Sequence, residues 1–257
     1  MELVTPLISA GVLARRRSGA GKRLTVVQPE TLVHFCEQHF PHGADEASFA
    51  SARVAGVAQF RDSKMLGSTD GEIVTLRGWE NGRLTSAGAP VDIVTPTLVH
   101  GAFSFVLKPE TPYAIRRQVA LVENPAVFLE FERLRSNVPV AIYAHGRISD
   151  RLLDWLASQR DDGFQLIHFG DYDPVGLDEF RRLASKLAGR AKLHIPTNLA
   201  ELFRKYSKRD LLVGAMSQKL LAGLRESGDT AVQCVIELIE RHNGGLEQEA
   251  LLIGAAE

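Results

Sequence analysis

The second half of the chain alternates short apolar runs with segments in which apolar residues recur every three or four positions. The short runs predict buried strands, expected at 118–122, 138–144, 164–169 and 191–195. The longer segments predict helices, expected near 125–135, 150–159 and 175–188, with a further helical region at 198–243. Parallel strands need crossover connections, so this pattern predicts an α/β fold with a parallel sheet flanked by helices.

The first third of the chain has a more mixed pattern. Apolar residues at 24–27 predict a strand, and a helix is expected at 30–39. Two further strands, at 73–76 and 83–85, flank the dipeptide Asn-Gly at 81–82, which favours a tight hairpin turn. The pattern therefore predicts a mixed, β-rich α+β region.

A boundary between these two patterns is expected where prolines interrupt both of them. The segment 108–112 contains two prolines and fits neither a strand nor a helix. We expect a mixed α+β domain at 1–112 and an α/β domain with a helical C-terminal extension at 113–257. The sequence leaves the role of residues 1–112 open between DNA binding and partner binding.

Composition places the chain among ordinary folded proteins. Its 257 residues are 45% hydrophobic and 24% charged. No apolar run approaches the ~18 residues that cross a bilayer, and the start, Met1-Glu2, lacks the basic segment of a signal peptide. We therefore expect a cytoplasmic protein without membrane contact. Cys36 and Cys234 match no zinc spacing, which predicts that they are buried small residues.

The most informative polar residues follow the third of the expected strands. Asp171 and Asp173 come directly after 164–169, and residues two positions apart in an extended segment project to the same side. Pro174 suits a first helical turn, and Gly176 lets the backbone approach closely. This spacing predicts two carboxylates that face one divalent cation. The alternative is that Asp173 only caps the helix and Asp171 is solvated.

A third carboxylate follows another strand. Because Asn124 can cap the next helix and Pro125 can begin it, Glu123 is needed for neither purpose. Sites in open α/β sheets lie outside the carboxyl ends of the strands, so Glu123 converges with the two aspartates if the strands are neighbours. Three such carboxylates repel one another unless cations lie between them.

The order of these residues resembles a known family. A Glu at one strand end and Gly-Asp-Tyr-Asp-Pro-Val-Gly at 170–176 are similar to the Toprim domain. The Pro and Gly after the second Asp resemble the branch that contains the topoisomerase VI A subunit, the meiotic break-forming proteins and the JetD nuclease of the Wadjet plasmid-defence system. Residues 244–250, Gly-Gly-Leu-Glu-Gln-Glu-Ala, also resemble the closing segment of JetD-like proteins. The resemblance covers roughly 113–257 and none of 1–112.

This resemblance implies a metal-dependent DNA endonuclease or nickase of the Toprim class, acting in plasmid or phage defence with an SMC-like partner. It implies that Asp171 and Asp173 hold one or two Mg²⁺ or Mn²⁺ ions, which neutralise the phosphate and the leaving oxygen. Glu123 is expected to bridge to the metal or to act as general acid/base. Glu247 and Glu249 are candidates for further metal ligands.

Positive charge gathers in the sequence after the aspartates. Between 181 and 209 there are nine Lys or Arg residues and one acid, Glu201, although the whole chain has a net charge of −1. Cations beside a metal site suit a phosphodiester enzyme, and the candidate nucleic-acid contacts are Arg204, Lys205, Lys208 and Arg209. Arg147 is a further candidate, because it follows a Gly-containing loop typical of Toprim proteins. The alternative is a solvated charged face.

The four tyrosines bear on the reaction type. Topoisomerase relatives use a nucleophilic tyrosine from a separate N-terminal module, but residues 1–112 contain no tyrosine. Hydrolysis by a metal-activated water remains, as the resemblance to JetD-like proteins implies. Cleavage of RNA or another phosphoester stays open, as does a non-catalytic module that binds nucleic acid or a partner. A homodimer is expected if one site must cut each strand.

Overall fold

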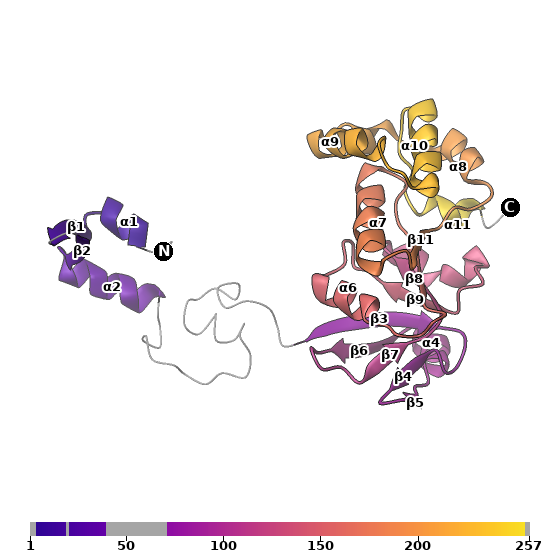
Figure 1. Ribbon diagram of the computed structural model, residues 1–257, viewed down its shortest axis with the longest axis horizontal. Coiled ribbons are helices and arrows are strands. Elements are labelled where there is room, and N and C mark those ends of the chain that lie inside the picture. Colours follow the sequence, from indigo (N-terminus) through magenta and orange to yellow (C-terminus); the bar gives the residue numbers. More distant parts are fainter. Residues whose placement is uncertain (1–3, 19–20, 40–70, 255–257) are drawn as a thin grey trace. The chain divides into compact units, whose positions relative to one another are not determined.

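The computed structural model describes residues 4–18, 21–39 and 71–254 (Figure 1). Contacts divide the chain into two compact units, Met1–Gly71 and Glu72–Glu257. In the first unit, helix α1 (Val4–Ser9) precedes an antiparallel pair formed by β1 (Leu13–Ser18) and β2 (Gly21–Val26), and helix α2 (Pro29–His39) follows. The expected strand and helix of this region correspond to β2 and α2.

The second unit is built on a six-stranded sheet with the order β11-β10-β8-β9-β3-β6. Its strands are β3 (Glu72–Gly78), β6 (Phe103–Leu107), β8 (Gln118–Val122), β9 (Val140–Tyr143), β10 (Gln165–Phe169) and β11 (Ala191–Leu193). The four strands expected from the apolar runs, β8 to β11, are parallel neighbours, as predicted. Strands β3 and β6 add an antiparallel half, so the sheet is mixed rather than wholly parallel.

The expected domain boundary at residue 112 is corrected by this sheet. Strands β3 and β6 precede that residue, yet β3 pairs directly with β9. The chain divides between Gly71 and Glu72 instead. The prolines of 108–112 mark only the turn that follows β6, because a local break in pattern does not report which strands pair across it.

The expected hairpin between 73–76 and 83–85 is also wrong. Strand β3 pairs with β6 and β9, whereas β4 (Leu84–Ser86) pairs with β5 (Ala89–Pro90) and β7 (Tyr113–Ile115) in a separate three-stranded sheet. Gly82 does form a turn, with a φ of 75°. The tight hairpin lies one strand later, where Ala87 and Gly88 both have positive φ, as a type I′ turn requires.

Helices cover the sheet and carry the capping signals of the sequence. α5 (Pro125–Leu129) begins at the Asn124 cap, α6 (Asp150–Ala157) at Ser149 and α7 (Pro174–Leu187) at Asp173. The helix expected over 125–135 is interrupted after α5 and continues as a 3₁₀ helix, Phe131–Leu134. The buried Arg77 donates to the carbonyls of Phe128 and Leu129, which satisfies the end of α5 at that point.

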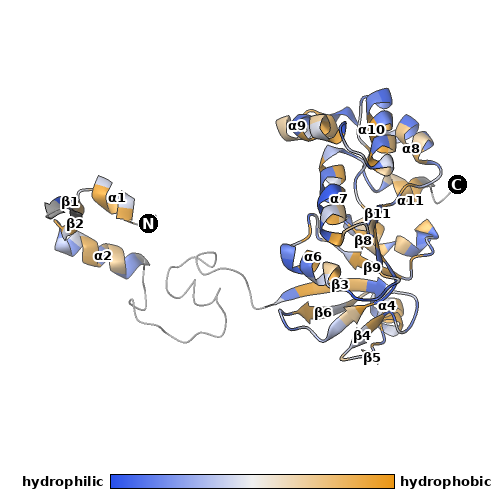
Figure 2. Ribbon diagram, viewed as in Figure 1, coloured by the Kyte–Doolittle hydropathy of each residue, from blue (hydrophilic) through white to orange (hydrophobic). Residues whose placement is uncertain are grey.

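The C-terminal part is helical, as expected. It comprises α8 (Leu199–Tyr206), a 3₁₀ helix (Arg209–Leu212), α9 (Ala215–Leu224), α10 (Thr230–His242) and α11 (Ala250–Gly254). Between α10 and α11 the chain returns to the sheet, where Leu246 pairs with Tyr172 and Gly245 with Lys208. Figure 2 shows apolar residues along the central strands and mixed colours on the covering helices. Cys36 and Cys234 are exposed, not buried as expected.

Candidate metal centre at the carboxyl edge of the sheet

Strands β8 and β10 bring the three predicted carboxylates to one edge. The two strands are adjacent and parallel, with Val122 opposite Phe169, so the residues that follow these strands leave the sheet at the same edge. The backbone N–H of Glu123 donates to the carbonyl of Phe169 at 3.2 Å and fixes this register one residue beyond the strands. The condition for convergence, that the two strands are neighbours, is therefore met.

The carboxylate of Glu123 has the most unusual environment of the three. Burial raises its pKa most, the charges of Asp171, Asp173 and Glu179 add to the rise, and a backbone hydrogen bond from Asp171 opposes it; together they move the pKa from 4.5 to about 7. Its Oε2 atom is buried and has no hydrogen-bond partner among the described residues. A buried acceptor without a donor is costly unless a ligand or water satisfies it.

Asp171 lies between Glu123 and the C-terminal segment. Its Oδ1 accepts a 2.8 Å hydrogen bond from the backbone N–H of Gln248. Burial nevertheless raises its pKa to about 6, helped by the negative charges of Asp173, Glu249 and Glu247. Like charges in a partly desolvated place favour either a proton or a cation.

Asp173 does have the capping role that the simpler interpretation gave it. Its Oδ1 accepts from the backbone N–H groups of Val175 at 2.9 Å and Gly176 at 2.8 Å. The residue is 7% exposed, and burial raises the pKa of its carboxyl group despite these two hydrogen bonds. Capping therefore occupies one oxygen of Asp173. The other oxygen is held at the sheet edge that also carries Glu123 and Asp171, which we call the acidic edge.

Two glycines allow the backbone to close around these aspartates. A Cβ atom on Gly176 would lie 2.2 Å from the carbonyl oxygen of Asp171, and one on Gly245 would lie 2.8 Å from Cβ of Asp173. Real Cβ atoms do not approach other atoms so closely. The close approach expected of Gly176 is thus present, and Gly245 provides a second one from the C-terminal segment.

Gln248 joins the C-terminal segment to both strand ends. It is fully buried; its Oε1 accepts from the backbone N–H of Asn124 at 2.7 Å, and its Nε2 donates to the carbonyl of Phe169 at 2.6 Å. Sequence reasoning singled out its neighbours Glu247 and Glu249 and missed Gln248. The signal available in the sequence was an uncharged amide, Gln248, between the two acids of the C-terminal segment.

Glu247 and Glu249 flank the site and already have partners. Glu247 forms an ion pair with Lys208, and Glu249 accepts from Nδ2 of Asn124 at 2.5 Å. Both still act electrostatically on Asp171. Among the described residues, no three His, Cys, Asp or Glu side chains are already arranged around one metal position.

Glu179 is a further acidic group near the site that the sequence reasoning overlooked. It is 5% exposed and lies on the buried face of α7 with Gly176 and Leu183. Its charge contributes to the raised pKa of Glu123. The signal in the sequence was a charged residue at a position of the apolar stripe, three residues after Gly176 and four before Leu183.

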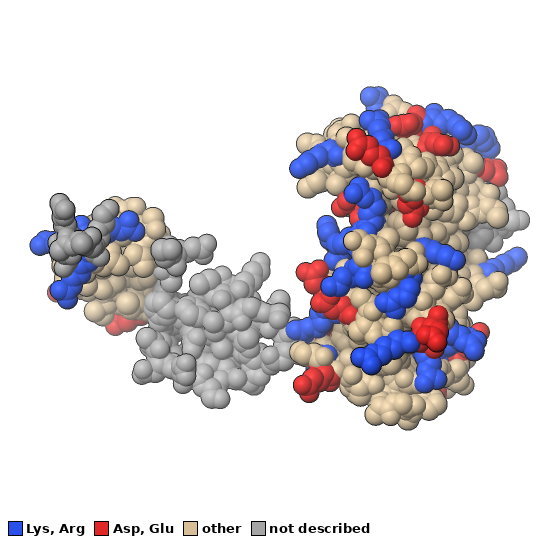
Figure 3. Space-filling model, in the orientation of Figure 1, with Lys and Arg blue, Asp and Glu red and all other residues tan. Residues whose placement is uncertain are grey.

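Most of the predicted basic stretch is occupied by contacts within the chain. Arg182 pairs with Glu179 and Asp150, Lys186 with Asp154, and Arg190 donates to backbone carbonyls of Ala157, Gln159 and Leu187. Of the candidate nucleic-acid contacts, Arg204 and Lys205 share Glu201, and Arg147 pairs with Glu179. On the face in Figure 3, basic groups are spread out with acidic groups among them.

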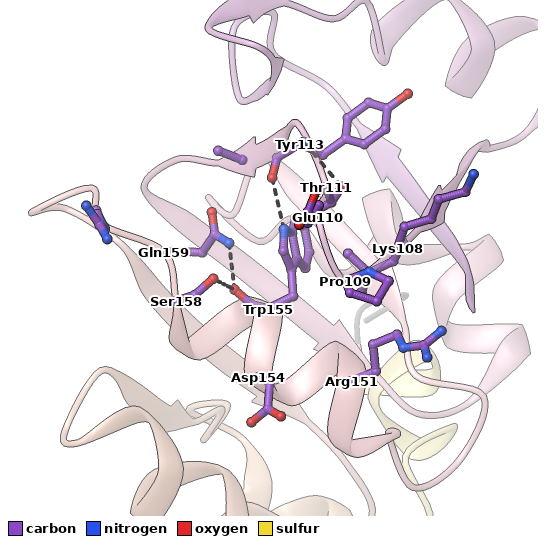
Figure 4. A pocket seen from close by; sticks show the side chains of 13 residues that line it. Lys108, Pro109, Glu110, Thr111, Tyr113, Arg151, Asp154, Trp155, Ser158 and Gln159 are labelled. Atoms are coloured by element: carbon purple, nitrogen blue, oxygen red, sulfur yellow. Dashed lines mark hydrogen bonds between the residues drawn. The ribbon is translucent and has the colours of Figure 1, made fainter. Parts of the chain in front are cut away.

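A cavity of about 800 Å³ lies apart from the carboxylates (Figure 4). Trp155, whose Nε1 donates to the carbonyl of Tyr113 at 3.0 Å, lines it together with Arg151 and Gln159. None of the acidic residues of the sheet edge lines this cavity.

The residues at the sheet edge fit a divalent cation. Carboxylate oxygens are the ligands that Mg²⁺ and Mn²⁺ prefer. Oε2 of Glu123 has no hydrogen-bond partner among the described residues, and Glu123 is close enough to Asp171 and Asp173 for their charges to raise its pKa. Cations at this edge would offset the mutual repulsion that raises the pKa values of Glu123 and Asp171. The donor set is therefore compatible with an oxygen-ligated metal ion.

Fold and site define an α/β protein with an acidic centre at the carboxyl edge of its sheet. The family model described as Wadjet protein JetD, C-terminal, matches residues 107–257, and the chain belongs to this family as a Wadjet component. No curated protein matches the chain. Within the described residues, no helix combines the length and apolar character needed to cross a membrane.

Proposed function

We propose that this protein is a Mg²⁺- or Mn²⁺-dependent DNA endonuclease or nickase of the Toprim class. The observation that carries the proposal is the buried Oε2 of Glu123, which lies beside two aspartates at one sheet edge and has no hydrogen-bond partner within the described part of the chain. Family membership adds the setting, because a Wadjet component acts in defence against foreign DNA, and we propose that it does so with an SMC-like partner.

In this proposal Glu123, Asp171 and the second oxygen of Asp173 hold the metal, and Glu247 and Glu249 add ligands. When bound, the cation supplies charge neutralisation at the phosphate and activates water. Without the cation, the carboxyl group of Glu123, with its pKa near 7, can hold or release a proton near neutral pH. Oδ1 of Asp173 keeps the start of α7 in place while the site works.

Tyr172, inside the acidic motif, does not serve as a nucleophile in this proposal. Its hydroxyl is buried and donates to the carbonyl of His194 at 3.0 Å, and burial raises the pKa of the phenol. A phenol that is harder to deprotonate and that is directed away from solvent is a poor nucleophile. Hydrolysis by water therefore accounts for the site better than a covalent tyrosyl intermediate.

DNA is proposed to reach the site over the start of the helical extension. Arg204, Lys205, Lys208 and Arg209 are exposed there, and Lys208 connects this surface to the acidic edge through its ion pair with Glu247 and its backbone pairing with Gly245. Phosphates compete effectively with exposed ion pairs, because such pairs are weak. A homodimer would supply one site for each strand.

The test is cleavage of supercoiled plasmid by the full chain with Mn²⁺, followed on a gel. Glu123→Gln and Asp171→Asn are expected to lower the rate by at least about 100-fold, the range of a lost acid/base or ligand group. Glu80→Gln, a change to an exposed carboxylate in the turn after β3, is the matched control and should leave the rate unchanged. Absence of Mn²⁺ binding by the native chain would instead favour a non-catalytic binding module.

A further inference from the structure

The loop after β9 carries an exposed arginine to the acidic edge. His145 and Gly146 both have positive φ, of 55° and 83°, which turns the chain sharply before α6 begins. The side chain of Arg147 is 65% exposed, and its Nε lies 3.1 Å from Oε2 of Glu179. Left-handed backbone at a non-glycine residue is uncommon, so the shape of this loop is specific.

The partner of Arg147 is a carboxylate that is held rigidly. The side chain of Glu179 is 6% exposed, and Arg182 binds it through two nitrogens, Nε at 3.0 Å and Nη2 at 2.6 Å. A planar guanidinium that contacts both carboxylate oxygens sets the orientation of the acid. Glu179 is therefore a fixed anchor on α7.

Arg182 also fixes the loop itself. Its Nη2 donates to the carbonyl of Ile148 at 2.7 Å, and its Nη1 lies 3.0 Å from Oδ1 of Asp150. The loop that carries Arg147 is thus tied to α7 at two points directly after that residue. Arg182 belongs to the predicted basic stretch, but its donors serve the structure of this loop.

The arrangement leaves the outer part of Arg147 available. Nε of Arg147 forms the contact with Glu179 while 65% of the side chain stays exposed, so the planar guanidinium fork keeps donors that a ligand can reach. Such a fork matches two oxygens of a phosphate. Glu179 lies close enough to Glu123 to act on its charge, so Arg147 is held at the same edge as the proposed metal ligands.

We propose that Glu179 is a positioning residue that holds Arg147 beside Glu123, so that the terminal nitrogens of Arg147 bind a phosphate of the DNA. This inference rests on the proposed function for its substrate. It differs from a general DNA-binding surface because one buried carboxylate, that of Glu179, determines the position of one exposed arginine, Arg147.

The test is a double-mutant cycle with Arg147→Gln, Glu179→Gln and the double variant. The affinity of the full chain for a short DNA duplex is measured by fluorescence anisotropy in Ca²⁺, without a cleavage readout. Arg147→Gln is expected to weaken binding by about tenfold, the value of one charge-assisted phosphate contact. Glu179→Gln should weaken it by a smaller factor, and the double variant should be no weaker than Arg147→Gln alone.

The pair Glu80–Arg83, in which the carboxylate is exposed and the arginine is half-buried, provides the control, because it also joins Nε to Oε2, at 2.9 Å. Glu80→Gln and Arg83→Gln should leave DNA affinity unchanged. Calorimetry of Mn²⁺ on Arg147→Gln separates this inference from the proposed function, because metal affinity should change by less than about threefold when only an exposed, solvent-screened charge is removed.

Additive effects in the double variant would show that Glu179 acts through the fold and would overturn the positioning role. Unchanged DNA affinity in Arg147→Gln, or no DNA binding by the native chain, would also overturn it. If the native chain does not bind Mn²⁺ but the double-mutant cycle gives the expected DNA affinities, only the proposed nuclease activity is rejected.

Discussion

The side-chain oxygen of Gln248 lies 2.7 Å from the backbone nitrogen of Asn124, a residue 124 positions earlier in the chain. The same amide donates to the carbonyl of Phe169, at the end of the neighbouring strand. One buried side chain therefore clamps the ends of β8 and β10 together and attaches the C-terminal segment to them. This clamp adds to the backbone hydrogen bond from Glu123 to Phe169 in holding Glu123 and Asp171 at the same edge.

Replacement of Gln248 should loosen this edge of the sheet. Gln248→Ala leaves the N–H of Asn124 without its partner and the carbonyl of Phe169 with the N–H of Glu123 alone, and we expect the free energy of unfolding to fall by about 1–3 kcal/mol. Urea unfolding measures this loss. Gln233→Ala, which removes a partly buried amide that binds the carbonyls of Leu224, Arg225 and Ser227 at the end of α9, tests whether loss of another such amide has the same effect on Mn²⁺ affinity. Only Gln248→Ala should weaken that affinity.

The aspartates should separate metal binding from capping. Asp173→Ala loses both the cap and a ligand, whereas Asp173→Asn keeps an oxygen for the cap, so only the alanine variant should lose about 1 kcal/mol of stability. Both should lose Mn²⁺ affinity in calorimetry, as should Asp171→Ala. Asp229→Ala removes an equivalent cap from α10 and should leave Mn²⁺ binding intact. Unchanged affinity in Asp171→Ala would remove this site from consideration.

Glu123 should make the metal-free protein less stable as pH rises. Its pKa is about 7 in the folded chain against an ordinary 4.5, so between these values the folded state holds the extra proton and stability falls with increasing pH. Because the group is partly exposed, the loss is about 1–2 kcal/mol after solvent screening. Glu123→Gln should recover this amount at pH 8, and little of it at pH 4. Urea unfolding with a chelator present measures both, and an equal gain at both pH values would contradict the assignment.

Tyr172 should be dispensable for cleavage. Tyr172→Phe removes only the hydrogen bond to His194, which we expect to cost about 1 kcal/mol of stability. The cleavage rate should stay within about tenfold, which corresponds to roughly 1.4 kcal/mol on the barrier. A stable protein–DNA adduct on a denaturing gel that disappears in the Phe variant would show covalent catalysis instead.

The basic surface should govern the salt dependence of DNA binding. Reversal of Arg204, Lys205, Lys208 and Arg209 to Glu should weaken binding to all sequences alike and flatten the salt slope by roughly 0.9 log units per lost phosphate contact. Lys208 also pairs with Glu247, so the variant with only the other three reversed controls for damage to the acidic edge. A salt slope that stays the same in the fourfold variant would identify this surface as solvated or as a partner interface.

Local features of this protein were predictable from sequence. The apolar runs placed β8 within 118–122, and the caps Asn124, Ser149 and Asp173 lie where polar residues precede helical periodicity. The same is true of the acids at the strand ends. These features depend on a residue and its near neighbours, and periodicity and capping report such interactions directly.

Only the tertiary structure decided which segments meet. Strand β3 pairs with β6 and β9 instead of forming the expected hairpin. The side chain of Gln248 forms hydrogen bonds with Asn124 and Phe169, and Glu179 forms an ion pair with Arg147. The backbone N–H of Gln248 donates to the carboxylate of Asp171, a residue 77 positions earlier in the chain, and no local periodicity links the two residues. Strand pairing and buried polar contacts of this kind depend on the packing of the whole core, so the composition of the acidic edge became defined only when the sheet was assembled.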